Sequence, residues 1–327
     1  MIRHKIPTRY GWIPRSSLAA IALCSLISCG QEPRQNRTGT AQQEAGQHSE
    51  EFALLTLRDA YGTTTTFTTP AQRIVSFAPN MTEIVGYLGA IDRLAGRTDF
   101  CTYPPHVDSI PSIGTLNSYN YERILGLHPD VILMMTFDGS SRSEYDKLKG
   151  LGLKPFALEG NSIDGVLNAI DTVGMMLGKA PLARHRTDSL RTIADSLRKM
   201  ASGQTPVQTF IIIDRSPLIT VADGFINEVL QSAGAQNIAA GDPVSYPVYS
   251  RELLLHKDPE VILVSSVSEN EAVLDDLLAL YPEWKELSAV RNHRVYPVPR
   301  DIISRPGPRI VDGLSYVYKL LHEPPTP

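Results

Sequence analysis

Two stretches of this chain share one pattern, and they decide the fold. Residues 121–133 read YERILGLHPDVIL, and residues 251–263 read RELLLHKDPEVIL. In each copy a glutamate, Glu122 or Glu252, stands seven positions before a proline, which is followed by an acid and then by Val-Ile-Leu. The pattern predicts a short helix with the glutamate in its first turn, an exit at the proline and a buried parallel strand.

The rest of the chain extends this repeat into two halves. Short apolar runs alternate with helical patterns, which is typical of an α/β fold with mostly parallel sheets. Each half also has a first strand and a helix that ends at a Gly-Ala pair, Gly89-Ala90 and Gly234-Ala235. We therefore expect two lobes of like topology. The clearest strands are predicted at residues 73–77, 131–135, 210–213, 261–265 and 294–298, after a small hairpin formed by residues 52–57 and 63–68.

A long helical pattern lies between the two halves. Apolar residues recur at helical spacing from Ile163 to Leu177, and the pattern continues to residue 202, with Gly178 and Pro181 marking a bend or break. We expect a stiff strut between the lobes. The predicted organisation is a first lobe with its leading hairpin at residues 52–160, a linking backbone helix at 161–203 and a second lobe at 204–327.

The N-terminus is typical of an exported lipoprotein. A basic leader precedes an apolar run at residues 18–27, which is too short to span a bilayer. Residues 26–30 (LISCG) resemble a bacterial lipobox, which predicts a signal peptide at 1–28 and a lipid on Cys29. The polar residues 29–51 predict a disordered tether. The protein would then be held on the periplasmic or extracellular face of a membrane. The alternative is an uncleaved signal anchor with an incidental cysteine.

Composition removes several functional classes. With three cysteines, of which Cys24 leaves with the leader and Cys29 carries the lipid, Cys101 has no partner for a disulfide and is expected to be a small buried side chain. A net charge of −4 gives no nucleic-acid footprint. The eight histidines form no H-x-x-x-H pair, and no G-x-S-x-G, P-loop or G-x-G-x-x-G motif occurs. We therefore predict no catalytic residues, no metal site and no cofactor.

Glu122 and Glu252 allow two interpretations. A carboxylate in the first turn of a helix is favoured by the helix dipole alone. Equivalent acids on two similar lobes also make a docking pair for basic residues on a symmetric partner, because charge-assisted pairs with arginine fix geometry. One residue can do both, and docking explains better why each lobe carries one.

Several motifs together resemble the substrate-binding proteins of importers for cobalamin, haem and ferric siderophores. They are residues 73–83 (RIVSFAPNMTE), 103–105 (YPP), 114–133, 250–252 (SRE) and 284–290 (WKELSAV). The resemblance implies a class III periplasmic binding protein, with two Rossmann-like lobes joined by a long backbone helix. It also implies that Glu122 and Glu252 meet arginine pockets of an ABC permease dimer, which works with ATPase subunits, and that hinge motion on ligand binding is limited.

The stretch 99–105 (DFCTYPP) and Tyr246-Pro247 are most similar to the cobalamin-binding branch, although tryptophans expected in that cleft are absent. Aromatic faces suit a flat corrin or porphyrin ring, and ligands of open α/β sheets lie beyond the carboxyl ends of the strands. The candidate ligand-binding residues are Pro79, Asn80, Tyr103, Tyr119, Phe137, Arg215, Tyr246, Arg300 and Arg305.

The predicted ligand is a cobalt- or iron-containing chelate, preferably cobalamin or a related corrinoid. A cleft rich in arginine would instead favour a ferric siderophore or haem, because guanidinium groups pair with carboxylates and phosphates. The alternatives outside this class are a secreted α/β hydrolase of the cell envelope and a sensor lipoprotein that never docks to a permease.

Overall fold

The computed structural model describes residues 52–323 except 117, 138 and 140. The predicted leader, tether and lipid site at Cys29 therefore lie outside the described residues. Within the described part of the chain, no helix has both the length and the apolar character needed to cross a membrane.

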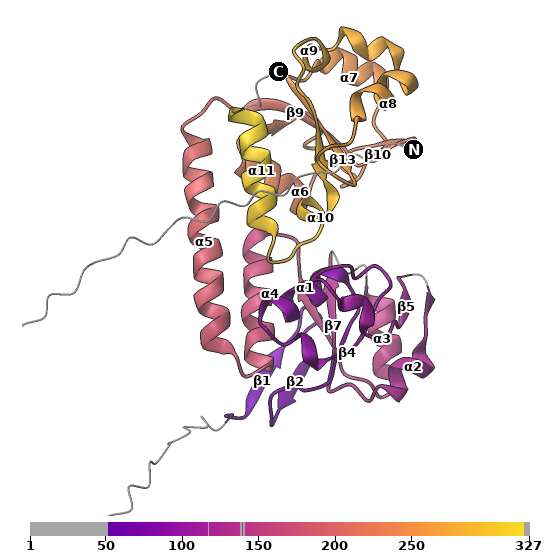
Figure 1. Cartoon of the computed structure of the whole chain (residues 1–327), viewed down its shortest axis with the longest axis vertical. Coiled ribbons are helices and arrows are strands. Elements are labelled where there is room, and N and C mark those ends of the chain that lie inside the picture. Colours follow the sequence, from indigo (N-terminus) through magenta and orange to yellow (C-terminus); the bar gives the residue numbers. More distant parts are fainter. Residues whose placement is uncertain (1–51, 117, 138, 140, 324–327) are drawn as a thin grey trace, which may run out of the picture. The chain divides into compact units, whose positions relative to one another are not determined.

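Two separate parallel sheets of four strands form the body of the chain (Figure 1). Their strand orders are β4-β3-β7-β8 and β12-β9-β13-β14, so each sheet places its second strand at one edge, followed by the first, third and fourth. This identical order confirms the two predicted lobes of like topology. The strands are β3 (Ile74–Ser76), β4 (Leu94–Arg97), β7 (Val131–Thr136), β8 (Pro155–Glu159), β9 (Val207–Ile212), β12 (Ala235–Asn237), β13 (Val261–Ser266) and β14 (Val295–Pro299).

Helices cover the sheets and connect the lobes. The first lobe carries α1 (Pro79–Tyr87), α2 (Tyr121–Gly126), α3 (Arg142–Gly150) and α4 (Ile163–Met176), and α5 (Ala180–Ser202) follows it. The second lobe carries α6 (Phe225–Ser232), α7 (Arg251–Lys257), α8 (Val273–Leu280), α9 (Ser288–Arg291), α10 (Arg300–Ile303) and α11 (Ile310–His322). Short 3₁₀ turns occur at Ile91–Arg93, Val107–Ser109 and Pro282–Glu286.

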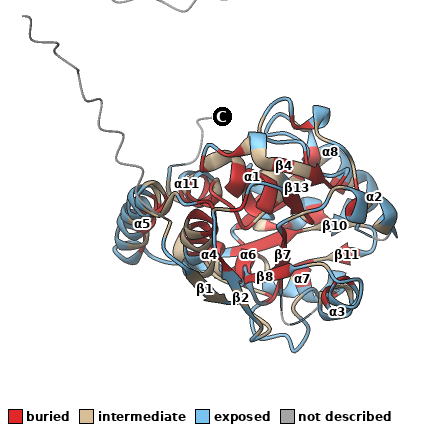
Figure 2. Cartoon of the chain, turned by 90° about the horizontal axis from the view of Figure 1, so that it is seen from below, coloured by how far each residue is buried: buried red, intermediate tan, exposed pale blue. Residues whose placement is uncertain are grey.

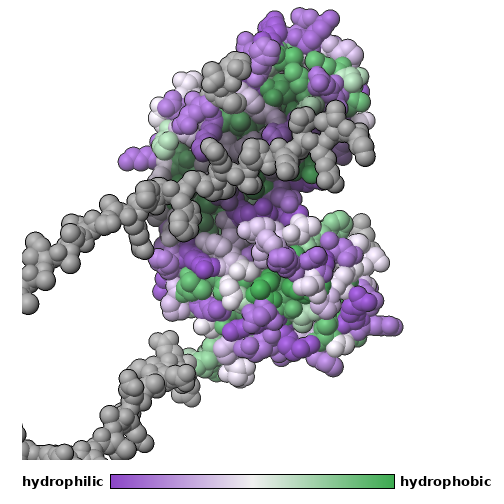
Figure 3. All heavy atoms as spheres, in the orientation of Figure 1, coloured by the Kyte–Doolittle hydropathy of each residue, from purple (hydrophilic) through white to green (hydrophobic). Residues whose placement is uncertain are grey.

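Burial explains the strand pattern. All six residues of β7 are buried, and so are five of the six in β13, because helices cover both faces of each sheet. Figure 2 shows the buried residues concentrated in the strands and on the inner faces of the helices. Figure 3 shows hydrophilic side chains spread over the exposed face of the molecule, with smaller apolar areas between them.

The repeated acid after the proline has a structural role in both lobes. The carboxylate of Asp130 accepts hydrogen bonds from the main-chain amides of Gln72 and Arg73 at 2.7 and 2.8 Å. The carboxylate of Glu260 accepts one from the amide of Gln208 at 3.1 Å. In each lobe the acid therefore ties the start of the third strand to the segment at the start of the first.

The segment predicted as a linking helix with a bend or break consists of two helices. α4 ends at Met176 and α5 begins at Ala180, so the break falls where Gly178 and Pro181 predicted one. Gly178 adopts a φ of +68° and Pro181 lies in the first turn of α5, where its missing N–H costs no hydrogen bond. Figure 1 shows the two helices side by side, with α5 continuing along α11. At 23 residues, α5 is about 34 Å long and forms the long link by itself.

Three small hairpins decorate the lobes. The predicted leading hairpin is present, with β1 (Leu55–Arg58) antiparallel to β2 (Thr64–Phe67). The amide of Ala60 in its turn donates to the carbonyl of Ala157 in β8, the edge strand of the first sheet, at 2.9 Å. This bond partly covers a sheet edge that would otherwise be open. The other two hairpins are β5 (Gly114–Thr115) with β6 (Ser118–Tyr119) and β10 (Asp214–Arg215) with β11 (Leu218–Ile219).

Candidate functional site

A cavity of about 340 Å³ lies at the carboxyl ends of β3 and β7 and is closed on one side by the second lobe. Its position fits the rule that ligands of parallel sheets lie beyond the carboxyl ends of the strands. The volume is at the lower end of the range of small-molecule pockets. The described residues that line it are Phe77, Ala78, Pro79, Asn80, Leu116, Tyr119, Met134, Met135, Phe137, Ser141, Ser304, Arg305 and Pro306.

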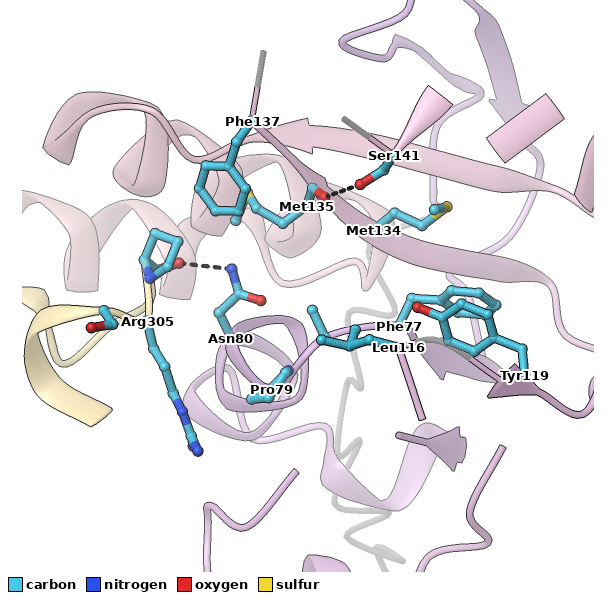
Figure 4. Close-up of a pocket in the computed structure, with 13 residues that line it drawn as sticks. Phe77, Pro79, Asn80, Leu116, Tyr119, Met134, Met135, Phe137, Ser141 and Arg305 are labelled. Atoms are coloured by element: carbon cyan, nitrogen blue, oxygen red, sulfur yellow. Dashed lines mark hydrogen bonds between the residues drawn. The ribbon is translucent and has the colours of Figure 1, made fainter. Parts of the chain in front are cut away.

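One end of the cavity is aromatic. The rings of Phe77 and Tyr119 lie with their centroids 4.5 Å apart and their planes tilted by 30°, as Figure 4 shows. Burial raises the pKa of Tyr119 to about 12, and the charge of Glu144 adds to this, so the hydroxyl is neutral at physiological pH. Leu116 and Phe137 are 52% and 38% exposed. This end therefore offers an apolar surface with a neutral hydroxyl group.

The other end holds Arg305, opposite the aromatic pair in Figure 4. Arg305 is the one charged side chain among the described residues that line the cavity. Its guanidinium lies 2.9 Å from the carboxylate of Asp301 and 3.4 Å from that of Glu83, and it donates to the hydroxyl of Thr102 at 3.4 Å. The positive charge of Arg305 is therefore already paired, most closely with Asp301.

The two lobes meet beside this cavity. The side-chain amide of Asn80, in the first turn of α1, donates to the carbonyl of Pro306 at 3.2 Å, and Figure 4 shows this bond crossing from one lobe to the other. Pro79 and Asn80 begin α1 directly after β3, because proline at the first position of a helix costs no hydrogen bond. The residues at the start of α1 therefore line the cavity at the point where the two lobes meet.

The structure brings five of the nine predicted ligand residues into this cavity: Pro79, Asn80, Tyr119, Phe137 and Arg305. Their role in binding stays a prediction. Met134, Met135 and Leu116 also line the cavity and were not among the predicted residues, although the two methionines end a predicted strand and so lie where a ligand of a parallel sheet binds. Leu116 lies in the β5–β6 turn, for which the sequence carried no signal.

The other four predicted residues lie elsewhere. The ring of Tyr103 lies under the guanidinium of Arg309 at 4.4 Å and lines a second cavity between α1, α5 and α11. The guanidinium of Arg215 pairs with Glu271 at 2.5 Å and Asp276 at 2.7 Å, which uses its charge within the second lobe.

Tyr246 and Arg300 are exposed in the second lobe and do not line either cavity. Tyr246 lies in a segment beside the chain after β11. The amides of Thr220 and Ala222 donate to the carbonyls of Pro247 and Ser245. Val244, Tyr246 and Val248 are each at least half exposed and alternate along this segment.

The repeated glutamates occupy matching places in α2 and α7. The side chains of Asn120 and Ser250 cap these helices by accepting from the amides of Arg123 and Leu253, at 2.9 and 3.1 Å. Glu122 and Glu252, in the first turns, are both exposed.

Glu252 has a defined ionisation state. The hydroxyl of Ser250 donates to its carboxylate at 2.7 Å and holds the pKa of Glu252 below its usual range. A charged carboxylate is therefore maintained at this site even in mildly acidic solution. Among the described residues, no group of three or more His, Cys, Asp or Glu side chains could hold a metal ion.

Two similar parallel-sheet lobes, a long helix linking them and a cavity between them define a two-lobed binding protein. The family model described as periplasmic binding protein matches residues 74–302, and this chain belongs to that family. It has the class III fold of two Rossmann-like lobes joined by a long helix.

Three known proteins are similar to this chain. A vitamin B12-binding protein of Vibrio cholerae is 30% identical over 250 residues, which covers 76% of this chain and 88% of the relative. An uncharacterised ABC transporter substrate-binding lipoprotein of Bacillus subtilis is 29% identical over 302 residues, which covers 90% and 92%. The crystal structure of the periplasmic vitamin B12-binding protein of Vibrio cholerae has a TM-score of 0.70 at 28% identity and covers 78% of this chain and 98% of that one. With these relatives, the chain is a substrate-binding transport protein and not an enzyme.

Proposed function

We propose that this chain captures cobalamin or a related corrinoid between its lobes, with part of the ligand in this cavity, and delivers it to an ABC importer. The observation that carries this proposal is the charge balance of the cavity. Its described walls are apolar and aromatic, and the single cation, Arg305, is already paired with Asp301 and Glu83.

This charge balance favours a neutral ligand over an anionic one. The corrin ring of cobalamin is edged with neutral amides, whereas haem carries two carboxylates and many ferric siderophores carry net negative charge. An anionic group in the cavity would have to compete with Asp301 for Arg305. Arg215, the other cation expected to favour such ligands, is held by Glu271 and Asp276.

The relatives support the same ligand class. The curated relative from Vibrio cholerae, which this chain matches over most of both lengths, is named for binding vitamin B12. The partly buried ring of Tyr119, backed by the buried ring of Phe77, offers an aromatic face for a flat corrin ring. In this proposal the exposed segment with Val244, Tyr246 and Val248 contributes contacts from the second lobe.

Isothermal titration of the purified chain with cobalamin, cobinamide, haem and a panel of ferric siderophores tests the ligand. We expect cobalamin or cobinamide to bind more tightly than haem or any siderophore. Replacing Phe137 by Ala should weaken corrinoid binding about tenfold, because it removes an aromatic contact. Arg305→Gln should change corrinoid affinity by less than that. If haem or a siderophore binds at least tenfold more tightly than cobalamin, and Arg305→Gln abolishes that binding, the corrinoid assignment is wrong.

We also propose that Glu122 and Glu252 dock the loaded protein onto the two subunits of a permease dimer. The two carboxylates occupy equivalent positions of the repeat, on capped helices at the surface of each lobe. An arginine that reaches such a carboxylate forms a charge-assisted, bidentate pair, which favours one orientation of the complex. In this proposal a lipid on Cys29 holds the chain at the membrane, where the importer lies.

Uptake measurements in cells that depend on this protein test the docking role. The double variant Glu122→Lys with Glu252→Lys should lose transport and keep the ligand affinity of the unaltered protein. A matched control is Asp188→Lys with Asp195→Lys, which reverses two exposed acids on α5. Equal uptake by the two double variants would contradict docking through Glu122 and Glu252.

A further inference from the structure

The first helix of each lobe carries a glutamate at an equivalent position. Glu83 in α1 and Glu228 in α6 each lie six residues before a glycine of positive φ, Gly89 at +63° and Gly234 at +90°. These are the Gly-Ala turns that end the two helices. The two glutamates are therefore a second pair of repeat-related acids, besides Glu122 and Glu252.

Glu83 reaches from the first lobe to the second. Its carboxylate is 2% exposed and accepts hydrogen bonds from both Nε and Nη2 of Arg309, at 3.0 and 2.7 Å. Arg305 lies on the same carboxylate at 3.4 Å. Burial alone would lower the pKa of Arg309, but the hydrogen bond and charge of Glu83, together with the charges of Asp301 and Tyr103, outweigh it and raise that pKa, so the guanidinium stays charged.

Glu228 makes the reverse connection, from the second lobe to the first and to the linking helix. Its carboxylate accepts from the main-chain amide of Ile163, the first residue of α4, at 2.9 Å. It also pairs with Arg198 of α5 at 3.0 Å. The amide at a helix N-terminus is both unpaired within the helix and at the positive end of its dipole, so a carboxylate binds well there.

We propose that Glu83 and Glu228 are paired positioning residues that hold the two lobes at a set separation and so set the width of the ligand cavity. Neither glutamate is among the described residues that line the cavity. Glu83 acts on it through the segment that leads into α11, because residues 304–306 form one wall of the cavity and Arg309 lies three residues further along the chain. One turn before Glu83, Asn80 binds the carbonyl of Pro306 in that wall.

The two pairs differ in strength. A buried bidentate arginine–carboxylate pair loses much when one partner is neutralised, because the remaining charge stays buried and unpaired. Glu228 and Arg198 are each 30% exposed, so water screens their interaction. Loss of Glu83 should therefore loosen the lobes more than loss of Glu228. The effect on ligand affinity rests on the proposed function, whereas the effect on lobe contact does not.

Hydrogen exchange of the whole chain, measured by mass spectrometry without ligand, tests the inference. In Glu83→Gln we expect amides of residues 160–170 and 300–310 to exchange about tenfold faster, while those of β7 and β13 keep their rates. Glu228→Gln should raise the exchange rates of the same amides about threefold. Asp188→Asn, which removes an exposed pair with Arg191 inside α5, is the control and should change neither set.

The binding assay completes the test. Glu83→Gln should weaken ligand binding about tenfold and Glu228→Gln about threefold. A uniform rise of exchange in all peptides, or no rise at the lobe contact, overturns the inference. If Glu83→Gln does not fold, the test uses Glu228→Gln, because loss of its partly exposed pair costs less stability. Faster exchange at residues 160–170 and 300–310, with unchanged rates in β7 and β13, then supports the inference. If the unaltered protein binds no corrinoid, the proposed ligand is wrong, and the exchange pattern still decides whether the two glutamates hold the lobes together.

Discussion

Gly174 lies where α4 packs closely against Ala183 of α5. A methyl group built on Gly174 would come within 2.2 Å of the Cβ of Ala183, far inside normal contact distance, and neither atom belongs to a flexible side chain. Gly174→Ala therefore forces the two helices apart by more than 1 Å or strains them locally. Because α5 links the lobes, this close approach is central to the architecture.

The two opposing effects of Gly174→Ala have known sizes. Alanine in a helix interior gains about 1 kcal/mol over glycine. Overpacking of a rigid contact costs about 1 to 3 kcal/mol. We expect a net loss of about 1 to 2 kcal/mol in the free energy of unfolding, since a contact of 2.2 Å belongs at the upper end of that cost. Helix propensity alone predicts the opposite, namely that Gly174→Ala stabilises the protein.

Urea denaturation followed by circular dichroism measures this difference, in a double-mutant cycle with Ala183→Gly. The double variant Gly174→Ala with Ala183→Gly moves the methyl group to the other helix. Its loss in the free energy of unfolding should therefore be smaller than the sum of the two single losses by at least about 1 kcal/mol. Gly150→Ala at the end of α3, where an added methyl meets nothing within 4 Å, is the matched control and should be neutral or stabilising. If Gly174→Ala is as stable as the unaltered chain, the close packing of α4 on α5 is refuted.

Two further predictions concern buried polar groups of the first lobe. The nearly buried guanidinium of Arg97 donates to the carbonyls of Thr98, Val107 and Asp108 at 2.8 to 3.1 Å, so Arg97→Met should lower the free energy of unfolding in urea by about 2 to 4 kcal/mol, and a loss below 1 kcal/mol would contradict this. Burial, together with a hydrogen bond to Asp59, raises the pKa of Tyr145 to about 12, so the stability from its neutral hydroxyl is complete below pH 10 and is lost as the pH rises to about 12. The urea midpoint of the unaltered chain should fall toward that of Tyr145→Phe over this pH range. A constant difference between the two midpoints would refute this prediction.

Much of the fold could be predicted from the sequence, because the signals are local. Apolar runs bounded by breakers marked the central strands, and the matched patterns at 121–133 and 251–263 indicated two lobes before any contact was known. Gly178 and Pro181 marked the break between α4 and α5, since positive φ and a missing N–H act on the backbone at the residue itself. The strands β4, β8 and β12 were not placed. The packing of α5 back along α4 was also missed, because periodicity does not show which way a chain continues after a break.

The candidate site divides differently. Pro79, Asn80 and Phe137 were predictable because they follow strands, and the carboxyl ends of parallel strands meet at one edge. The ion-pair partners of the arginines could not be predicted. Arg215 pairs with acids 56 and 61 residues away, and Arg305 with Glu83, 222 residues away.

The sequence by itself determined two similar lobes, their strands and the equivalent surface acids Glu122 and Glu252. Only the tertiary structure decided which cation reaches the cavity and which carboxylates neutralise it. The physical reason is that strand and helix patterns depend on neighbours along the chain, whereas the partner of a charge is set by which lobes and helices pack together.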